Sequence, residues 1–190
     1  MPERLALFID AAYLERALAD IFAQREGGRA VPLRPDFKRL PGVLALDKPW
    51  RTYYYYALPY RSNPPLPAEQ AAYEGRKRFV DFVGRQPRFL LREGVVERRV
   101  VRGEETYVQK RSDVMLAVDL TRLSVLHEIT AAVLVAGDSD FVPAVQAARD
   151  AGVRVRLRYE GSTAHADLIA ACDEAQPLTR HELEAIRLPG

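Results

Sequence analysis

Cysteine is almost absent from this sequence of 190 residues, in which Cys172 is the single example. One thiol cannot form a disulfide within the chain, and it cannot build a zinc site alone. The three histidines, His127, His165 and His181, lie far apart and lack the spacing of metal ligands. These shortages argue against a zinc centre, and the shortage of cysteine leads us to expect a cytoplasmic protein.

Long apolar runs are missing as well. The N-terminal stretch MPERLALFID reaches the acidic Asp10 after a handful of apolar residues, which does not fit a signal peptide, and no stretch approaches the length of a membrane span. The glycines are scattered, without the spacing of a phosphate-binding loop or a dinucleotide-binding fingerprint. We therefore expect no membrane partner and no nucleotide loop of these kinds.

The composition is that of a globular protein, with 48% hydrophobic and 28% charged residues, and the length suits a single domain over residues 1–190. A net charge of +2 conceals a polarised distribution. Positions 76–111 hold 11 Lys and Arg against 5 Asp and Glu, an excess of 6 that leaves −4 for the rest of the chain. This basic segment is either a solvated surface or a face for a polyanion, and the sequence leaves both readings open.

Runs with strand character alternate with runs of helical period along the chain. Strands are predicted at 5–9, 52–58, 88–91, 131–136 and 153–159, and helices at 11–25, 36–46, 68–84, 112–127 and 141–151. Alternating runs on either side of Arg102-Gly103-Glu104 predict a β-hairpin inserted at about 94–109. The pattern predicts an α/β fold in three layers, a mostly parallel sheet with helices on both faces. Three arginines in the last strand predict a solvated face near the sheet edge.

Carboxylates follow two of these predicted strands. Asp10 ends the first strand, Asp138 and Asp140 follow the strand that ends in VLVAG, and Asp113 and Asp119 lie in the helix before it. Ligands of open α/β sheets bind outside the carboxyl ends of the strands, so these acids are expected to meet there. Crowded carboxylates repel one another unless a cation neutralises them, and oxygen ligands without histidine or thiolate select Mg²⁺ or Mn²⁺.

Four of these five acids also have a simpler explanation. Asp140 could cap the helix that follows it, Asp113 could be a first-turn acid favoured by the helix dipole, and Asp10 could cap the first helix. Asp119 lies about 240° around a helix from Asp113, which favours a surface or helix-pairing role. An arrangement like that of haloacid-dehalogenase phosphatases would need an acid at position 12, which is Ala12. Convergence of several acids, rather than any one of them, favours a metal site.

Three blocks of the sequence resemble the signature motifs of NYN domains, the LabA-like branch of the PIN-like nuclease superfamily: FIDAAYL at 8–14, KRSDVMLAVDL at 110–120 and VLVAGDSDFVPAVQAARDAGVRV at 133–155. The resemblance implies a PIN-like (Rossmannoid) sheet with strand order 3-2-1-4-5, an acidic pocket for Mg²⁺ or Mn²⁺, and action on RNA. The implied catalytic and metal-binding residues are Asp10, Asp113, Asp138 and Asp140, with Asp119 as a further implied metal ligand.

One position departs from the family pattern. Tyr13 stands where the family usually has Asn, often after a Gly where this chain has Ala11. Tyrosine cannot replace an amide that orients a metal or a phosphate. The alternative to a nuclease is therefore a catalytically weak or inactive NYN module that binds RNA or a protein partner.

The resemblance and the basic segment together predict a metal-dependent ribonuclease that hydrolyses phosphodiester bonds of single-stranded or structured RNA. The candidate RNA-binding residues are Arg98, Arg99, Arg102, Lys110, Arg111, Arg61 and Tyr60. The four consecutive tyrosines at 53–56 are expected mainly in the core, because neighbouring strand residues face opposite sides of a sheet. Whether the protein forms a homodimer stays open.

Overall fold

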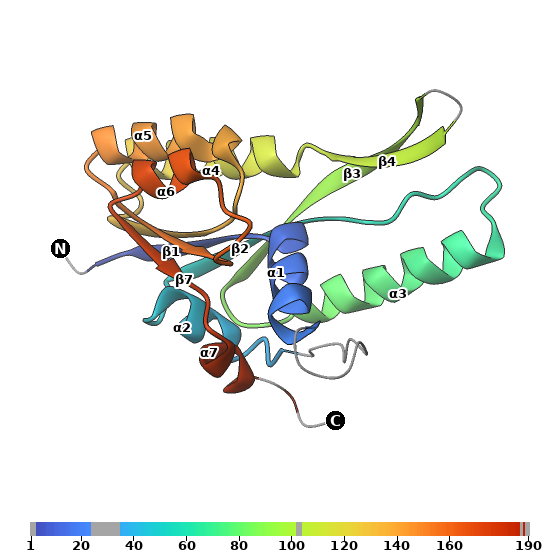
Figure 1. Cartoon of the computed structure of the whole chain (residues 1–190), viewed down its shortest axis with the longest axis horizontal. Coiled ribbons are helices and arrows are strands. Elements are labelled where there is room, and N and C mark those ends of the chain that lie inside the picture. The colour runs from blue at the N-terminus through green and yellow to red at the C-terminus, as the bar shows by residue number, and fades with distance from the viewer. Residues whose placement is uncertain (1–2, 24–34, 102–103, 187, 189–190) are drawn as a thin grey trace.

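Seven strands form a central sheet in the computed structural model, which describes residues 3–23, 35–101, 104–186 and 188 (Figure 1). The strands are β1 (Leu5–Asp10), β2 (Arg51–Ala57), β3 (Phe89–Val101), β4 (Glu104–Lys110), β5 (Ala131–Val135), β6 (Arg154–Tyr159) and β7 (Glu174–Pro177). Their order is β4-β3-β2-β1-β5-β6-β7, and every neighbouring pair is parallel except β3 with β4. The mostly parallel sheet and the order 3-2-1-4-5 of its five predicted strands are confirmed.

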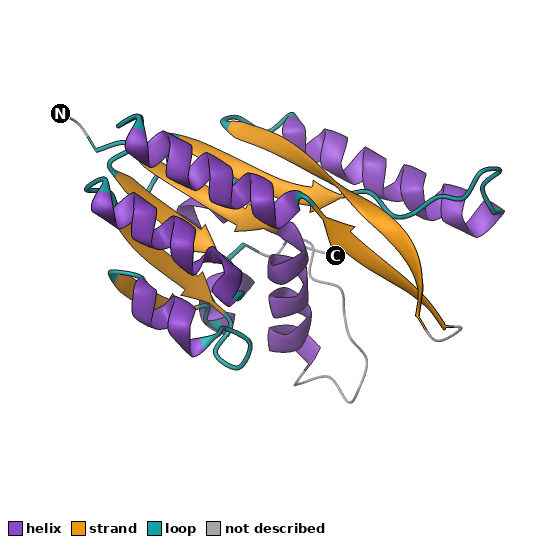
Figure 2. Cartoon of the chain, turned by 90° about the horizontal axis from the view of Figure 1, so that it is seen from above, coloured by secondary structure: helices purple, strands orange, loops and turns teal. Residues whose placement is uncertain are grey.

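Helices cover both faces of the sheet, as the alternating pattern predicts. One face carries α4 (Ser112–Val125), α5 (Val142–Asp150) and α6 (Ala166–Ala171), and the other carries α1 (Ala11–Ala23), α2 (Leu40–Ala45), α3 (Pro67–Gly84) and α7 (Arg180–Glu184) (Figures 1 and 2). A short 3-10 helix, η1 (Ser139–Phe141), leads from β5 into α5. Among the described residues, none of the helices has the length and apolar character needed to cross a bilayer.

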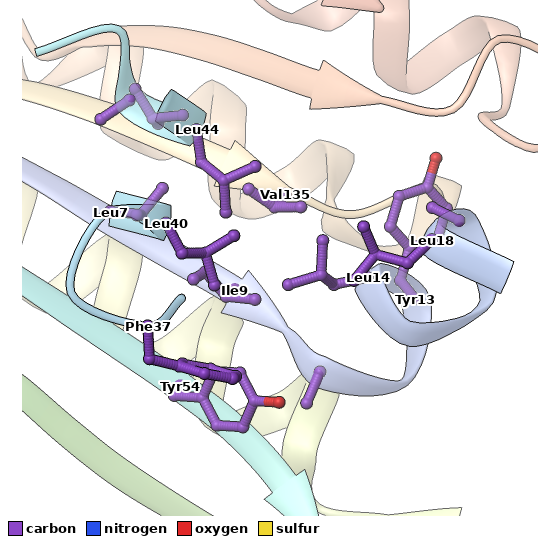
Figure 3. Packing of buried hydrophobic residues seen from close by; sticks show 14 of the residues in the cluster. Leu7, Ile9, Tyr13, Leu14, Leu18, Phe37, Leu40, Leu44, Tyr54 and Val135 are labelled. Carbon is purple, nitrogen blue, oxygen red and sulfur yellow. The ribbon is translucent and has the colours of Figure 1, made fainter. Parts of the chain in front are cut away.

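The central strands are buried on both faces because both of their alternating residue sets are apolar. In β1, Leu7 and Ile9 pack in the layer of α1 and α2, whereas Ala6 and Phe8 pack in the layer of α4 and α5. Figure 3 shows Leu7 and Ile9 in one cluster with Leu14 of α1 and with Leu40 and Leu44 of α2. Burial on both sides fixes the register of β1, since a slip of one residue would move every side chain to the other layer.

The tyrosines of β2 belong to this core. Tyr54 and Tyr56 pack in one layer and Tyr53 and Tyr55 in the other, each at most 5% exposed. The hydroxyl of Tyr55 donates to the carboxylate of Asp119 at 3.0 Å. These rings are therefore closed to RNA bases, which confirms the prediction that they serve the core.

The predicted hairpin exists, but it is an extension of the third core strand rather than a separate insertion. β3 pairs in parallel with β2 as far as Gly94 and then in antiparallel with β4 from Val95 onward. A Cβ at Gly94 would lie 2.7 Å from the backbone oxygen of Lys110 and 3.2 Å from the backbone nitrogen of Ser112. Glycine at this point therefore lets β3 change partners next to the start of α4.

The arginine face of β6 is only partly solvated, because Arg154 is exposed and Arg156 half-buried, whereas Arg158 is buried. β7 pairs outside β6, so β6 lies one strand in from the edge. Arg158 is 2% exposed and donates through its guanidinium to Glu182 of α7 at 2.7 Å and to Gln176 of β7 at 3.2 Å. The predicted position near the sheet edge is confirmed. The predicted solvation is wrong for Arg158, because β7 and α7 are too short to produce a recognisable period, and their carboxylate and amide groups pair the arginine that they cover.

The contact at Gly94 predicts a steric cost. Gly94→Ala should lower the free energy of unfolding by about 1–3 kcal/mol, because the new methyl group meets fixed backbone atoms rather than a flexible side chain. Gly161→Ala is the matched control, since a Cβ there has no neighbour within 4 Å. Urea denaturation of both variants provides the measurement, and equal stabilities would show that β3 does not need glycine at its change of partner.

Candidate active site

The two acids of the first and third sequence blocks meet because β1 and β5 are parallel and in register. Ile9 lies beside Val135, so Asp10 and the Gly137-Asp138 turn leave the sheet at the same carboxyl edge. A cavity of about 920 Å³ at this edge is lined by Asp10, Asp138 and Asp113, which α4 brings from a third direction. We call this cavity the acidic pocket; its other walls come from α1, the end of β4 and the loop after β6.

Asp10 is held in place by the start of α1. Its Oδ1 accepts hydrogen bonds from the backbone N–H groups of Ala12 at 3.0 Å and Tyr13 at 3.2 Å, so Asp10 does cap the first helix. Burial raises the pKa of Asp10 to about 6; the backbone N–H groups oppose this shift and the negative charge of Asp113 adds to it. Asp10 can cap the helix and still line the pocket, because the hydrogen bonds to its Oδ1 orient the carboxylate toward the pocket.

Asp113 stands in the first turn of α4, beside Asp10 and Asp138. Partial burial raises its pKa, Ser112 lowers it through a hydrogen bond, and the charges of Asp138 and Asp140 raise it further. The helix begins after Arg111, whose φ of 75° is a left-handed conformation that costs energy for a residue with a side chain. This strained residue turns the chain from β4 into α4 and so brings Asp113 to the pocket.

Asp138 and Asp140 take different places. Asp138 caps η1 by accepting from the backbone N–H of Asp140 at 3.0 Å, so the cap is the first acid of the pair and not the second. The side chain of Asp140 lines a separate apolar groove of about 810 Å³ between α4 and α5, which it shares with Asp113. The charge of Asp140 acts on Asp113, which lines both cavities, but Asp140 itself does not line the acidic pocket.

The carboxylates do not form a ready-made metal cage. Within the described residues, no group of three or more His, Cys, Asp or Glu side chains is arranged to hold an ion. Mg²⁺ is commonly bound through one or two carboxylates together with water and substrate phosphates, and not by a complete protein cage. The donor set of Asp10, Asp113 and Asp138 fits that mode, since it offers charged oxygens only and leaves room for water and phosphate.

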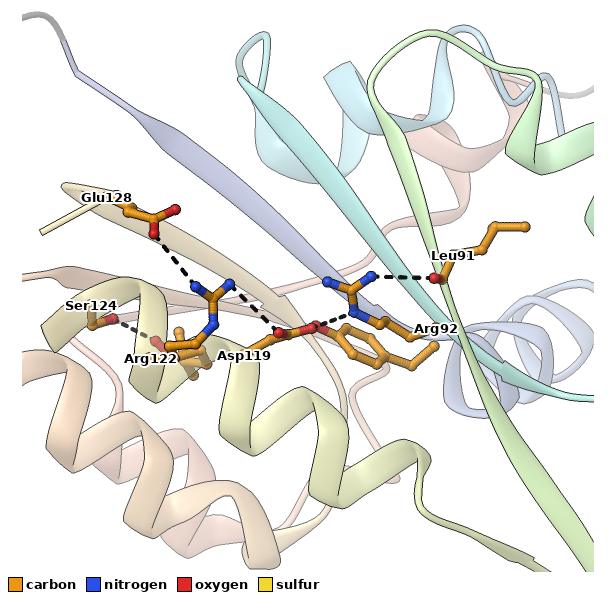
Figure 4. A network of polar contacts seen from close by, with 8 residues as sticks. Leu91, Arg92, Asp119, Arg122, Ser124 and Glu128 are labelled. Atoms are coloured by element: carbon orange, nitrogen blue, oxygen red, sulfur yellow. Dashed lines mark hydrogen bonds and ion pairs between the residues drawn. The ribbon is translucent and has the colours of Figure 1, made fainter. Parts of the chain in front are cut away.

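Asp119 lies apart from these acids, in the middle of a polar network between α4 and β3 (Figure 4). Its Oδ2 accepts from Arg92 Nε at 2.7 Å and from the Tyr55 hydroxyl, and its Oδ1 lies 3.9 Å from Arg122. Its side chain is 12% exposed and does not line the acidic pocket. Asp119 therefore ties α4 to the sheet, and we exclude it from the metal ligands that the resemblance implies.

Comparison with known proteins identifies the family of the chain. A family model described as the NYN domain matches residues 4–179. The chain belongs to the NYN domain family. NYN domains are part of the PIN-like nucleases, which typically use divalent metal ions. The chain is also similar to a crystal structure of a protein of unknown function from Vibrio parahaemolyticus, at 16% identity over 94% of both chains with a TM-score of 0.56, a likeness that shows the fold alone. No curated protein matches the chain.

Tyr13, the residue that departs from the NYN pattern, is built into the wall of the pocket. Its hydroxyl accepts from the backbone N–H of Glu160 at 2.9 Å and lies 3.2 Å from the Thr163 hydroxyl, so it links α1 to the loop after β6. A Cβ at Gly137 would fall 2.3 Å from the Tyr13 ring. The glycine between β5 and Asp138 is therefore matched to this ring, and the departure at position 13 is accommodated by its neighbours.

The sequence analysis did not name several residues of the pocket as site residues, among them Arg16, Asp20, Gln109 and His165. Arg16, two turns into α1, lines the pocket, and its positive charge lowers the pKa of both Asp10 and Asp113. Gln109 enters from the end of β4. Arg16 could have been found from its position one turn after Ala12 on α1. Gln109 could not, because its placement depends on the pairing of the hairpin.

The candidate RNA-binding residues lie in different settings. Arg98 pairs with Glu105 and Lys110 with Glu97, whereas Arg99 and Arg111 are exposed. Arg61 lies 4.3 Å over the ring of Tyr73 in α3, and the Tyr60 ring lies 5.5 Å from that of Tyr107. Arg102 lies outside the described residues. The basic segment is thus partly neutralised by its own acids, and its exposed arginines flank the hairpin.

The buried position of Asp10 predicts a pH dependence of stability in metal-free protein. A carboxyl whose pKa rises from 3.8 to about 6 on folding binds its proton more tightly in the folded state. Its contribution to stability is therefore present below about pH 4 and is lost as the pH rises through 6, and the total is at most about 3 kcal/mol. Asp10→Asn keeps an acceptor for the two N–H groups but removes the charge.

The stability of the wild type relative to Asp10→Asn should accordingly fall between pH 4 and pH 7. Urea denaturation in EDTA measures this difference, and using the difference cancels the titration of groups that both proteins share. A difference that does not change with pH would contradict the assigned burial of Asp10.

Proposed function

We propose that this NYN protein is a metal-dependent ribonuclease whose reaction centre is the acidic pocket. The observation that carries the proposal is the meeting of Asp10, Asp113 and Asp138, from three separate elements, in one cavity at the carboxyl edge of the sheet. Burial raises the pKa of Asp10 and of Asp113, and the charges of neighbouring carboxylates raise both pKa values further. Membership of a nuclease family supports the same reading.

Asp10, Asp113 and Asp138 would hold a Mg²⁺ or Mn²⁺ ion, which when bound supplies an activated water and neutralises charge on the leaving oxygen. The hydrogen bonds from the backbone N–H groups of Ala12 and Tyr13 keep the Asp10 carboxylate oriented toward the ion. Arg16 places a positive charge in the same pocket, where it can contact a phosphate oxygen of the substrate. Asp140, in the neighbouring groove, adds negative charge near Asp113 and so strengthens the attraction for a cation.

The basic segment supports RNA as the substrate. Arg99 on the hairpin and Arg111 at the start of α4 are exposed, and Arg111 lies two residues before Asp113. A phosphate backbone that follows these side chains would be led to the pocket by charge, with little dependence on base sequence. The acids of the pocket alone would repel RNA, so an adjacent basic surface is needed for binding.

A second candidate function is RNA binding without cleavage. The observation that favours it is Tyr13, whose hydroxyl is occupied by Glu160 and Thr163 and whose ring fills the space beside Gly137. The side-chain amide of the Asn that the family usually has at this position is thus replaced by a tyrosine with a structural role. On this alternative the pocket would bind a cation or a phosphate but would not hydrolyse RNA.

A cleavage assay separates the two functions. We expect the wild type to cut a labelled RNA with Mn²⁺ or Mg²⁺ and to be inactive in EDTA. Asp138→Asn should lower the rate by about 10²-fold or more, because a charged ligand is lost, while RNA binding is kept or tightened since one repulsive charge is removed. Asp150→Asn, which neutralises an exposed acid at the end of α5, should cut like the wild type.

Cleavage without a metal ion, or equal cleavage rates for Asp138→Asn and the wild type, would contradict the proposal of a metal-dependent nuclease. RNA binding by both proteins with no cleavage under any metal would instead establish the binding module.

A further inference from the structure

Tyr107 is a large aromatic residue on the surface of the hairpin. It is 53% exposed, although it sits in the middle of β4 and its neighbours in the strand are paired. The ring of Tyr60, from the loop after β2, lies 5.5 Å from it at an angle of 47°. The two rings contact each other without stacking face to face, so the outer face of Tyr107 stays open to a ligand.

The tyrosine pair lies beside the acidic pocket. Alternate residues of a strand share a face, so Tyr107 and Gln109 point to the same side of β4. Gln109 lines the acidic pocket. Two residues of a strand span about 7 Å, which places the aromatic pair roughly one nucleotide from the pocket wall. A chain lying along this face of the hairpin would therefore reach both features.

Arg98 and Glu105 hold the aromatic pair in position. Arg98 lies opposite Tyr107 in the β3–β4 register and forms an ion pair with Glu105. Interaction with Glu105 and a hydrogen bond with Tyr60 raise the pKa of Arg98, and the Tyr107 hydroxyl donates to Glu105 at 3.3 Å. Because the guanidinium is already paired with a carboxylate, this cluster offers an organised apolar surface more than a free positive charge.

We propose that Tyr107 and Tyr60 form a stacking platform for an unpaired base of single-stranded RNA whose backbone continues to the acidic pocket. Stacking on an aromatic ring requires a base that is splayed out, which a duplex does not offer. The platform would thus select single strands over duplexes at the mouth of the site. The choice of RNA as ligand rests on the proposed function, but the binding surface itself is a separate set of residues.

Binding measured without cleavage tests the platform. Fluorescence anisotropy in EDTA would compare a labelled single-stranded RNA with a duplex of the same sequence. Tyr107→Ala should weaken binding of the single strand by about 5- to 100-fold, the range for one lost base-stacking contact, and should leave duplex binding nearly unchanged. Tyr107→Phe keeps the ring and should bind like the wild type, which separates stacking from the hydrogen bond to Glu105.

Two further variants sharpen the test. Glu105→Gln removes a carboxylate that occupies Arg98, so it should tighten binding of single-stranded RNA if the strand passes this cluster. Thr106→Ala is the matched control, because Thr106 is exposed and points to the opposite face of β4. Melting curves of all variants show whether the hairpin remains folded.

Three results would each overturn the proposed platform. Tyr107→Ala could bind the single strand as tightly as the wild type does, it could lose equal affinity for single strand and duplex, or the wild type could fail to bind RNA at all. The proposed function fails independently: a protein that shows the predicted stacking effects but never cuts RNA has the platform without the nuclease. Conversely, a protein whose cleavage of RNA depends on Asp138 but whose RNA affinity does not change in Tyr107→Ala is a nuclease without the platform.

Discussion

Like charges gather at one edge of the sheet, and the parallel register of β1 against β5 is the constraint that keeps them there. Ile9 and Val135 are paired and fully buried, so neither strand can slip without moving apolar side chains out of both core layers. Asp10 and Asp138 must then leave the sheet side by side. Burial is the main cause of the raised pKa of Asp10, and the negative charge of Asp113 adds to it. The proposed metal ion would neutralise these charges.

The other walls of the pocket depend on contacts between distant parts of the chain. Tyr13 joins α1 to the loop after β6 through its hydroxyl, and its ring fits only because position 137 has no side chain. On the opposite side, Gly94 lets β3 pass close to the start of α4, and the strained Arg111 turns the chain into that helix. Both glycines therefore serve the placement of an acid: Gly137 precedes Asp138, and the approach at Gly94 positions the turn that carries Asp113.

Much of the fold could be predicted from the sequence, because strands such as β1 and β5 are continuous apolar runs and the helices between them have a clear period. The meeting of Asp10 with Asp138 followed from the rule that ligands bind at the carboxyl ends of parallel strands. The positions of the two acids of the second block were harder to predict. Asp113 and Asp119 share a helix, and their offset of about 240° already favoured different roles, but only the packing of α4 shows that Asp119 is tied to Arg92.

Other features left no readable signal. The buried pairing of Arg158 with Glu182 depends on α7, a helix too short to show a period. Gln109 and Tyr107 acquire meaning only from the β3–β4 register, and the partners of Tyr13 lie about 150 residues away in the sequence. Long-range contacts of this kind are set by tertiary packing, which local propensity does not encode. What could not be predicted is therefore the detail of the site rather than its position.

Metal binding to the isolated protein tests the central claim most directly. Mn²⁺ at millimolar concentration should raise the melting temperature of the metal-free wild type, because an ion that binds only the folded state stabilises it by mass action. Asp10→Asn should lose most of this response, and Asp150→Asn, with the same change of charge far from the pocket, should keep it. The account is contradicted if Mn²⁺ shifts the melting temperature of Asp10→Asn and of the wild type by the same amount.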